Sequence, residues 1–541
     1  MDRKCARKQR RTRFRVLGLV VALTLPLAHA AAAKPAIRRS AAEATPPAGS
    51  VVAAPWGTPE GKGTVSDPVD LATALSASGP VRPGGTVLLR GGTYEGTFVS
   101  TLAGTPAQRI LVTSFRRENP VLDGGSAART TLTIQGQDVT FSSLEIRKSD
   151  PVRISAQPGS APTDLPRGRA DGVRVYGSRI RLSKLYVHDH GNGIILWPHA
   201  AEAEVHSSVI ANNGWMGPDR GHGHGIYVQN EAPGRKLISD NIVFNNFGWG
   251  IHGFADDPIV SRISLKRNVS FNNGAPTGDT NPNLLFGTRK GSAESIELEG
   301  NIFFHGSGSG LNVKLGYGAG PNRDLSMKGN TLVGGSPVLE VLNWDNADST
   351  NNLFGTFTEG TTGARRLVRL RTPATTSSGL AGPYRWDGNT YLVDDGGRTV
   401  SLENFELNGE RGANATVGLT FDEWKNVTAL DQTSSFGTTI ASQAIVLRDP
   451  FEPGRAVVVV INGGGSAVSV SPRSLGLRFG QRFSVRDAQN LPGSPVASGV
   501  NFGRPIKLPT QLSTVVPPYG DAPRSVEHTS PRFVAFLVAA S

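Results

Sequence analysis

Two histidines and a tyrosine near the middle of the chain form a pattern that suits proton transfer. A loop ending in Gly-His-Gly-His-Gly places His224 directly before a short apolar segment that carries Tyr227. His252 holds the same position as Tyr227 in the next segment of that kind. Imidazole titrates near neutral pH, and a phenol can act as base or acid when a cation lowers its pKa. We predict that His252, Tyr227 and His224 are catalytic, with Lys314 as the accompanying cation.

Residue types that bind sugars surround these groups in the neighbouring segments. Aromatic rings can stack on sugar faces, while cationic and amide side chains can bind hydroxyls or carboxylates. The alternative is that loops or an accessory domain cover this surface and make its aromatic rings ordinary core. The predicted substrate-binding residues are Arg174, Tyr176, Trp197, Gln229, Phe254, Asn312 and Glu340.

The Gly-His-Gly-His loop also allows two other roles. It can be a tight turn whose imidazoles bond to backbone carbonyls. Alternatively, its histidines could bind a metal together with His252 and Asp219 or Asp256, although His-x-His in a loop is weakly specific. Calcium would prefer a carboxylate-rich loop such as Asp256-Asp257. We predict no metal ligands, and Ca²⁺ is the alternative cofactor.

The candidate residues belong to a hexapeptide frame that recurs seven times between residues 172 and 343. Gly193-Ile-Ile-Leu-Trp-Pro and Gly225-Ile-Tyr-Val-Gln-Asn are two copies, and the copies start 21 to 33 residues apart. Their second and fourth positions are apolar almost throughout, which predicts a strand with one buried face. This spacing is typical of stacked repeats. The third and fifth positions then face solvent on rungs about 4.8 Å apart, as two stripes of a polymer-binding groove.

A second frame follows the first and contains a repeated asparagine. Ser239-Asp-Asn-Ile-Val-Phe-Asn-Asn and Lys266-Arg-Asn-Val-Ser-Phe-Asn-Asn are two of its copies. Amide side chains stacked in register can hydrogen-bond from one rung to the next. We expect a buried ladder of Asn241, Asn268, Asn301 and Asn330.

Two strands and turns per repeat, with little helical periodicity between them, predict an all-β fold. The usual crossover rule makes it a right-handed parallel β-helix. On these frames, and on the opening stretches Pro83-Gly-Gly-Thr-Val-Leu-Leu-Arg and Pro120-Val-Leu-Asp-Gly-Gly, the chain resembles the pectin-lyase-like superfamily. The resemblance implies a secreted bacterial carbohydrate-active protein. Lyases of this fold often use Lys or Arg as the base with calcium, which adds Lys314 as an alternative base.

The remaining sequence divides into four parts. Residues 1–30 combine eight basic residues, an apolar run and an Ala-His-Ala cleavage site, as a signal peptide does. Residues 31–60 are rich in Ala and Pro and predict a disordered linker. The β-helix is expected over 61–438, with a capping box at Thr420–Glu423 near its end. Spaced strands over 439–541 predict a small C-terminal β-sandwich accessory domain.

The composition and charge of the chain indicate where the protein acts and what kind of partner it binds. The chain has 541 residues with 66 Gly and 36 Pro, and its single cysteine, Cys5, lies in the predicted signal peptide. More than half of the formal net charge of +12 also comes from that segment. The rest is only mildly basic, which gives slight support to an acidic polymer as partner. We predict a monomer that is secreted or periplasmic and binds a polysaccharide, with neither nucleic acid nor membrane as partner.

Three functions fit this groove. A polysaccharide lyase that cleaves a uronic-acid polymer by β-elimination needs a cation for the carboxylate, a base for the C5 proton and an acid for O4. A glycoside hydrolase needs two carboxyl groups roughly 5–10 Å apart, for which Glu340, Asp345 and Asp256 are the outward candidates. A non-catalytic polysaccharide-binding surface protein would use the same groove only to bind. The cation and proton-carrier residues favour the lyase.

Overall fold

The computed structural model describes residues 46–540. Its gaps are 128, 166–168, 258, 279–280, 307–309, 319–320, 359–364, 372–374, 377–378, 381–382, 395–402, 409–415, 463 and 465–466. The predicted signal peptide and the first part of the predicted linker, residues 1–45, lie outside the described residues. Residues 47–541 form one compact unit.

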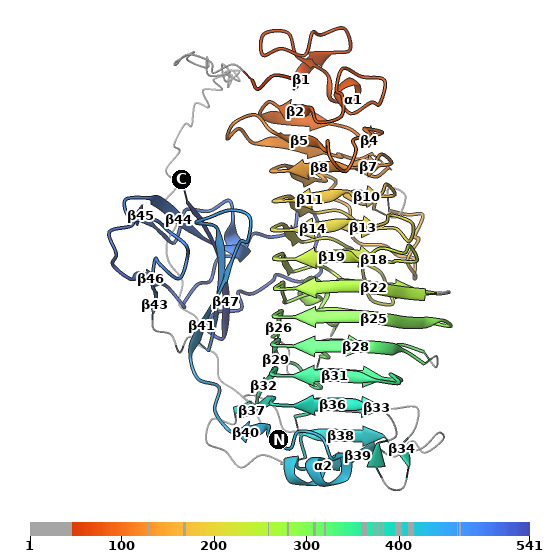
Figure 1. Ribbon diagram of the computed structural model, residues 1–541, viewed down its shortest axis with the longest axis vertical. Coiled ribbons are helices and arrows are strands. Elements are labelled where there is room, and N and C mark those ends of the chain that lie inside the picture. The colour runs from red at the N-terminus through yellow and green to blue at the C-terminus, as the bar shows by residue number, and fades with distance from the viewer. Residues whose placement is uncertain are drawn as a thin grey trace, which may run out of the picture. The chain divides into compact units, whose positions relative to one another are not determined.

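Three twelve-stranded sheets run the length of a right-handed parallel β-helix, and each turn of the chain contributes one strand to each sheet (Figure 1). We name each sheet after its first strand. The β1 sheet consists of β1 (Ser50–Thr58), β2 (Thr86–Leu89), β5 (Ile110–Ser114), β8 (Val139–Ser142), β11 (Arg181–Ser183), β14 (Glu204–His206), β19 (Lys236–Ser239), β22 (Ile259–Lys266), β25 (Ser292–Glu299), β28 (Arg323–Lys328), β31 (Ala347–Thr350) and β36 (Tyr384–Asp387).

The other two sheets complete each turn. The β3 sheet consists of β3 (Gly92–Glu95), β6 (Pro120–Asp123), β9 (Glu145–Arg147), β12 (Tyr186–His188), β15 (Val209–Ala211), β20 (Ile242–Phe244), β23 (Val269–Phe271), β26 (Ile302–His305), β29 (Thr331–Gly334), β32 (Leu353–Phe357), β37 (Thr390–Asp394) and β40 (Ser435–Gly437). The β4 sheet consists of β4 (Phe98–Ser100), β7 (Leu132–Ile134), β10 (Val173–Val175), β13 (Ile194–Leu196), β18 (His224–Val228), β21 (Trp249–Ala255), β24 (Leu284–Thr288), β27 (Val313–Leu315), β30 (Leu339–Leu342), β33 (Val368–Arg371), β38 (Phe405–Asn408) and β39 (Thr416–Leu419), of which only β39 is antiparallel.

The predicted asparagine ladder is confirmed at the corner between the β1 and β3 sheets. Asn241 Nδ2 donates to Asn268 Oδ1 over 2.9 Å, and Asn268 and Asn301 each donate in the same way to the next rung over 3.0 Å. Each of these amides also donates to a backbone carbonyl, so every ladder residue is buried and satisfied. The ladder continues beyond the predicted range through Asn352 and Asn389.

Left-handed backbone precedes this ladder on every rung. Asp240, Arg267, Gly300 and Gly329 have φ between 53° and 63° and directly precede the four ladder residues. This conformation turns the chain sharply, and glycine adopts it without steric cost. The same ladder amides then take up the backbone groups that the turn leaves unpaired.

Two helices and the first strand define the ends of the solenoid. Helix α2 (Phe421–Thr428) has the predicted capping box, with Thr420 as its N-cap. Helix α1 (Leu71–Ala74) is capped by Asp70, whose side chain accepts a hydrogen bond from the Thr73 backbone N–H. Strand β1 begins at Ser50, inside the stretch expected to be linker, because its apolar Val51–Ala54 run pairs with β2 and is buried.

The C-terminal segment forms small antiparallel sheets. One sheet consists of β41 (Gln443–Arg448), β42 (Ala456–Ile461), β47 (Phe533–Ala540), β44 (Arg482–Asp487) and β45 (Ala497–Val500). β43 (Val468–Val470) and β46 (Ile506–Leu508) form a second sheet, and the 3-10 helix η2 (Ala488–Asn490) follows β44. The solenoid strands end at β40, before this segment begins. The division into separate domains remains a prediction.

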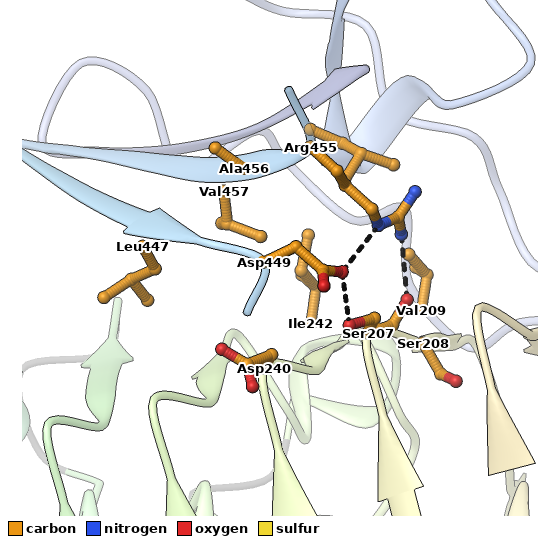
Figure 2. Close-up of a pocket in the computed structure, with 11 residues that line it drawn as sticks. Ser207, Ser208, Val209, Asp240, Ile242, Leu447, Asp449, Arg455, Ala456 and Val457 are labelled. Atoms are coloured by element: carbon orange, nitrogen blue, oxygen red, sulfur yellow. Dashed lines mark hydrogen bonds and ion pairs between the residues drawn. The ribbon is translucent and has the colours of Figure 1, made fainter. Parts of the chain in front are cut away.

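The larger C-terminal sheet packs on the β3 sheet. The Phe533 ring lies 4.9 Å from Phe271 and 4.6 Å from Phe304, between ring centroids. Figure 2 shows the polar edge of this contact, where Asp449 accepts a hydrogen bond from Ser207 Oγ over 2.6 Å and Arg455 donates to the Ser207 carbonyl over 2.8 Å. From β15 to β29 the β3 sheet is therefore apolar on both faces, and the outward face of the β4 sheet carries the candidate site.

We predict that the ladder is a major source of stability. In Asn301→Ala, the backbone N–H and the Nδ2 of Asn268 lose their acceptor, and the Leu265 carbonyl loses its donor. Unpaired buried groups should lower the free energy of unfolding by about 3 kcal/mol, measured by denaturant titration. Asn346→Ala is the matched control, since Asn346 bonds to Asp324 at an exposed site. A change equal to that of the control would contradict a stabilising ladder.

Candidate active site

The outward side chains of the β4 sheet form one column along the solenoid. Register pairs Tyr227 with His252 on the next rung, as the sequence predicted. His252 then pairs with Leu285 and Leu285 with Lys314, so Lys314 lies two rungs beyond His252. In order, the column reads Arg174, Ile195, Tyr227, His252, Leu285, Lys314, Glu340 and Arg369.

The hexapeptide frame that starts at Gly310 predicts that Leu311 points inward and that Lys314 lies at the fifth position, in the second outward stripe. This register is wrong by two residues. Val313 pairs with Leu284 and enters the core, which places Lys314 in the His252 column. Asn312 is fully buried and accepts from Asn283 Nδ2 over 2.9 Å, so the prediction that it binds substrate is wrong. It ends a second asparagine ladder, which runs through Asn213, Asn246, Asn273, Asn283 and Asn312.

The predicted catalytic histidines meet in a cluster of stacked rings. His252 Nδ1 lies 3.2 Å from His224 Nε2, within hydrogen-bonding distance. The Tyr227 ring centroid is 5.5 Å from that of His224 and 5.4 Å from that of His252. Trp249 lies against both imidazoles, at 4.9 and 4.5 Å, and Phe254 stacks on His252 at 5.1 Å. The structure thus brings together three of the four predicted catalytic residues.

Burial keeps both imidazoles neutral. Burial, aided by the charge of Arg220, lowers the pKa of His252 to about 3. Burial and the neighbouring His252 and Arg220 hold the pKa of His224 well below its usual value. The His252 side chain points out of the sheet but is only 6% exposed, so it packs within the ring cluster and does not stand free in solvent as expected.

The phenol of Tyr227 stays protonated and is held in place. Burial raises the pKa of Tyr227 to about 12. Its hydroxyl donates to the Phe254 carbonyl over 2.8 Å and accepts from Gln229 Nε2 over 3.1 Å. Gln229 also donates to the Phe254 carbonyl over 2.9 Å, so it orients the phenol, although it lines neither cavity of the groove.

A short hairpin, which the sequence did not reveal, places a further cation over the cluster. β16 (Trp215–Met216) and β17 (Gly221–His222) pair in the long loop before β18. His222 stacks on Trp215 at 5.2 Å, and its Nε2 lies 2.9 Å from Asp219 Oδ1. These contacts fix the end of the loop, where the Arg220 guanidinium lies 5.0 Å from the Trp249 ring. No repeated pattern in the sequence marks Arg220, because its position depends on how this loop folds.

Two adjoining cavities form the groove above these residues. One, of about 680 Å³, is lined by His224, Tyr227, Trp249, His252 and Arg220, among others. The second, of about 900 Å³, extends toward β4 and shares Ser160, Arg174 and Asn192 with the first. Of the predicted binding residues, Arg174, Trp197 and Phe254 line the first cavity.

Trp197 and a fixed cation, Arg174, line one wall of the groove. Tyr176 lines neither cavity but stacks on Trp197, with centroids 5.9 Å apart and planes within 14°. The Arg174 guanidinium lies 5.9 Å from the Trp197 ring and is paired with the buried Asp171. This wall can offer a sugar both a flat apolar face and a guanidinium.

Lys314 and Glu340 are engaged with each other, away from the cluster. Lys314 Nζ lies 3.0 Å from Glu340 Oε2, and Glu340 Oε1 lies 3.2 Å from Arg369. Neither residue is among those that line the two cavities. The structure therefore does not bring Lys314 to the imidazoles, and Glu340 is compensated by two cations.

Carboxylates suited to a metal are sparse around the groove. Asp256 lines the first cavity, and its Oδ1 lies 3.0 Å from the exposed Arg289 Nε. Within the described part of the chain, no group of three or more His, Cys, Asp or Glu residues is arranged to hold a metal ion. No helix among the described residues is long and apolar enough to cross a bilayer.

No protein-family model and no curated protein matches the sequence. Among solved structures, the pectate lyase Pel9A is 15% identical with a TM-score of 0.39, over 67% of this chain and 79% of that one. A rhamnogalacturonan lyase is 13% identical with a TM-score of 0.40, over 69% and 89%. The GH136 lacto-N-biosidase from Eubacterium ramulus is 14% identical with a TM-score of 0.36, over 63% and 67%.

The depressed pKa of His252 predicts a loss of stability in acid. Below about pH 6.5 the unfolded chain binds a proton that the folded imidazole, with its pKa of about 3, does not. The contribution of His252 to the free energy of unfolding is therefore fully present above about pH 6.5 and is lost as the pH is lowered. Between pH 7 and pH 5 the wild type should lose about 2 kcal/mol more than His252→Gln, measured by denaturant titration at each pH. Equal losses in the two proteins would show that His252 is not held neutral.

Proposed function

We propose that the protein is a polysaccharide lyase that cleaves a uronic-acid-containing polymer by β-elimination in the groove of the β4 sheet. One observation carries the proposal. The cavity of about 680 Å³ is lined by two neutral imidazoles, a protonated phenol and the guanidinium groups of Arg174 and Arg220. These are the three kinds of group that elimination from a uronate requires.

The cations would bind the uronate carboxylate. Charge on that carboxylate must be stabilised while the C5 proton leaves, and guanidinium groups match carboxylate geometry with two hydrogen bonds. Arg220 and Arg174 both line the cavity, and each is held against an aromatic ring. A bound carboxylate would also offset the positive charge of Arg220, which helps to depress the pKa of His252. Substrate binding would thus make the imidazole a stronger base.

The two proton carriers take complementary roles. In the tautomer in which His252 Nδ1–H donates to His224 Nε2, the His252 Nε2 lone pair accepts the C5 proton. The C5–H electron pair forms the C4–C5 double bond, and the C4–O4 bond breaks. The Tyr227 hydroxyl, protonated at neutral pH, supplies a proton to the leaving O4. Atoms and charges balance without a further reactant.

The carboxylates of the groove support the lyase over a hydrolase. Among the described residues that line the first cavity, Asp256 is the only carboxylate, and it is paired with Arg289. The second cavity adds Asp171, which is paired with Arg174. A hydrolase needs one carboxylic acid and one carboxylate across the scissile bond. The signal-like segment of residues 1–30 agrees with a secreted or periplasmic site of action, where such polymers occur.

The reaction is identified by incubating the protein with acidic and neutral polysaccharides. Elimination creates an unsaturated uronate that absorbs in the ultraviolet. On an acidic polymer, this absorbance and the concentration of reducing ends should therefore both rise. Reducing ends without the absorbance would instead identify a hydrolase. Binding without either signal would identify a non-catalytic polysaccharide-binding protein.

We predict that His252→Gln and Tyr227→Phe each lower kcat/KM by at least about 100-fold on the polymer that the protein cleaves. Each change removes a proton carrier while keeping a side chain of similar size. His206→Gln is the matched control, because His206 is also buried and has a lowered pKa but lies on β14 in the β1 sheet. Full activity of His252→Gln would exclude His252 as the base.

A further inference from the structure

We propose that the C-terminal β unit carries a separate binding surface for an acidic polysaccharide, centred on Phe479 and Phe502. The inference rests on the proposed function for the class of polymer. The surface itself is defined by two loops, 478–482 before and at the start of β44 and 501–504 after β45. It shares no residue with the groove of the β4 sheet.

Two large apolar rings stand exposed in these loops. Phe479 is 78% and Phe502 is 64% exposed, among the most exposed large apolar side chains of the described residues. Their ring centroids lie 5.8 Å apart with planes at 69°, so the rings contact each other edge to face. This arrangement leaves ring faces open to solvent, and apolar surface of this kind often marks a binding site.

A network of backbone bonds holds the two loops together. Gly480 N donates to the Asn501 carbonyl over 2.8 Å, and Asn501 N donates to the Gln481 carbonyl over 2.9 Å. Asn501, itself buried, donates from Nδ2 to the carbonyls of Leu477 and Arg478 over 3.1 and 3.0 Å. The exposed rings are therefore presented by a fixed frame, which reduces the entropy lost when a ligand binds.

The exposed charged residues of the two loops and of the adjoining sequence are all cations. Five of them lie in the loops or within five residues of them along the chain: Arg473, Arg478, Arg482, Arg504 and Lys507. Among the described residues none of the five has a carboxylate partner. The only acidic residue between positions 471 and 520 is Asp487, which is buried against His528 at 3.1 Å. A cluster of uncompensated cations attracts a polyanion.

Rings and cations together select an acidic sugar chain. A sugar presents an apolar face that can lie on an aromatic ring, while a uronate carboxylate at its edge can bind a guanidinium. The groove of the β4 sheet combines the same two features in Arg174, Tyr176 and Trp197. A second surface of this chemistry would keep the protein on its polymer between cleavage events and raise the local concentration of substrate.

Affinity electrophoresis of the full protein tests the surface. The probes are native gels that contain polygalacturonate, alginate or hyaluronate, with neutral hydroxyethylcellulose as the comparison. We expect at least one acidic polymer to retard the wild type. The double variant Phe479→Ala/Phe502→Ala should bind that polymer roughly tenfold more weakly.

The triple variant Arg478→Gln/Arg482→Gln/Arg504→Gln should weaken binding to a similar extent, and added salt should weaken the binding of the wild type. Lys328→Gln, which removes one exposed cation on β28, and Trp56→Ala, which removes an exposed ring on β1, should each leave binding unchanged.

The outcomes separate this surface from the groove. Cleavage of short soluble oligosaccharides should be the same in both loop variants and the wild type, whereas His252→Gln should lose cleavage and keep retardation. If no polymer is cleaved, retardation still tests the surface. Equal retardation of wild type and both loop variants would overturn the proposal. A second outcome would also overturn it: the wild type binds vesicles of phosphatidylglycerol and phosphatidylcholine, both loop variants lose this binding, and gel retardation is the same in all three proteins. The partner would then be a lipid surface.

Discussion

The hydrogen-bonded asparagine ladders are the interaction on which the rest of the structure depends. A turn of the solenoid can change direction in two or three residues only if the backbone enters the left-handed region, as at Asp240 and Arg267. Such a corner leaves amide and carbonyl groups that the sheets cannot pair. Asn241, Asn268 and Asn301 bond to these groups and to one another in the buried interior. The corner, the ladder and the register of the adjoining strands are thus fixed by the same bonds.

This fixed register gives the candidate site its geometry. Because consecutive outward residues of the β4 sheet are one strand spacing apart, Tyr227 and His252 must be neighbours, whatever loops separate them in sequence. The loops then decide what surrounds the column. The β16–β17 hairpin brings Arg220 over Trp249, and together they bury imidazoles that would otherwise face solvent. The same rule places Lys314, Glu340 and Arg369 in one chain of alternating charge, which holds these residues away from the reaction centre.

The solenoid, its ladder and the Tyr227–His252 pairing could be predicted from the sequence, because each depends on a repeated local pattern. The prediction is wrong at Asn312, where a frame matched by apolar spacing alone hides an interior ladder residue. Asn283 and Asn312 lie in frames that lack the Phe-Asn-Asn signature, so only three-dimensional register links them to Asn246 and Asn273. The burial of His252 and the position of Arg220 could not be predicted, since both depend on how one irregular loop folds over its neighbours.

Burial shifts the pKa values of the proposed acid and the proposed base in opposite directions. It raises the pKa of Tyr227 to about 12, which keeps the phenol protonated and able to donate a proton at neutral pH. It lowers the pKa of His252 to about 3, which keeps a lone pair available but makes the free imidazole a weak base. A base that is always deprotonated and gains strength only when a carboxylate offsets Arg220 would act on a uronate and spare a neutral sugar. Selectivity for acidic polymers would then arise in the proton transfer itself as well as in binding.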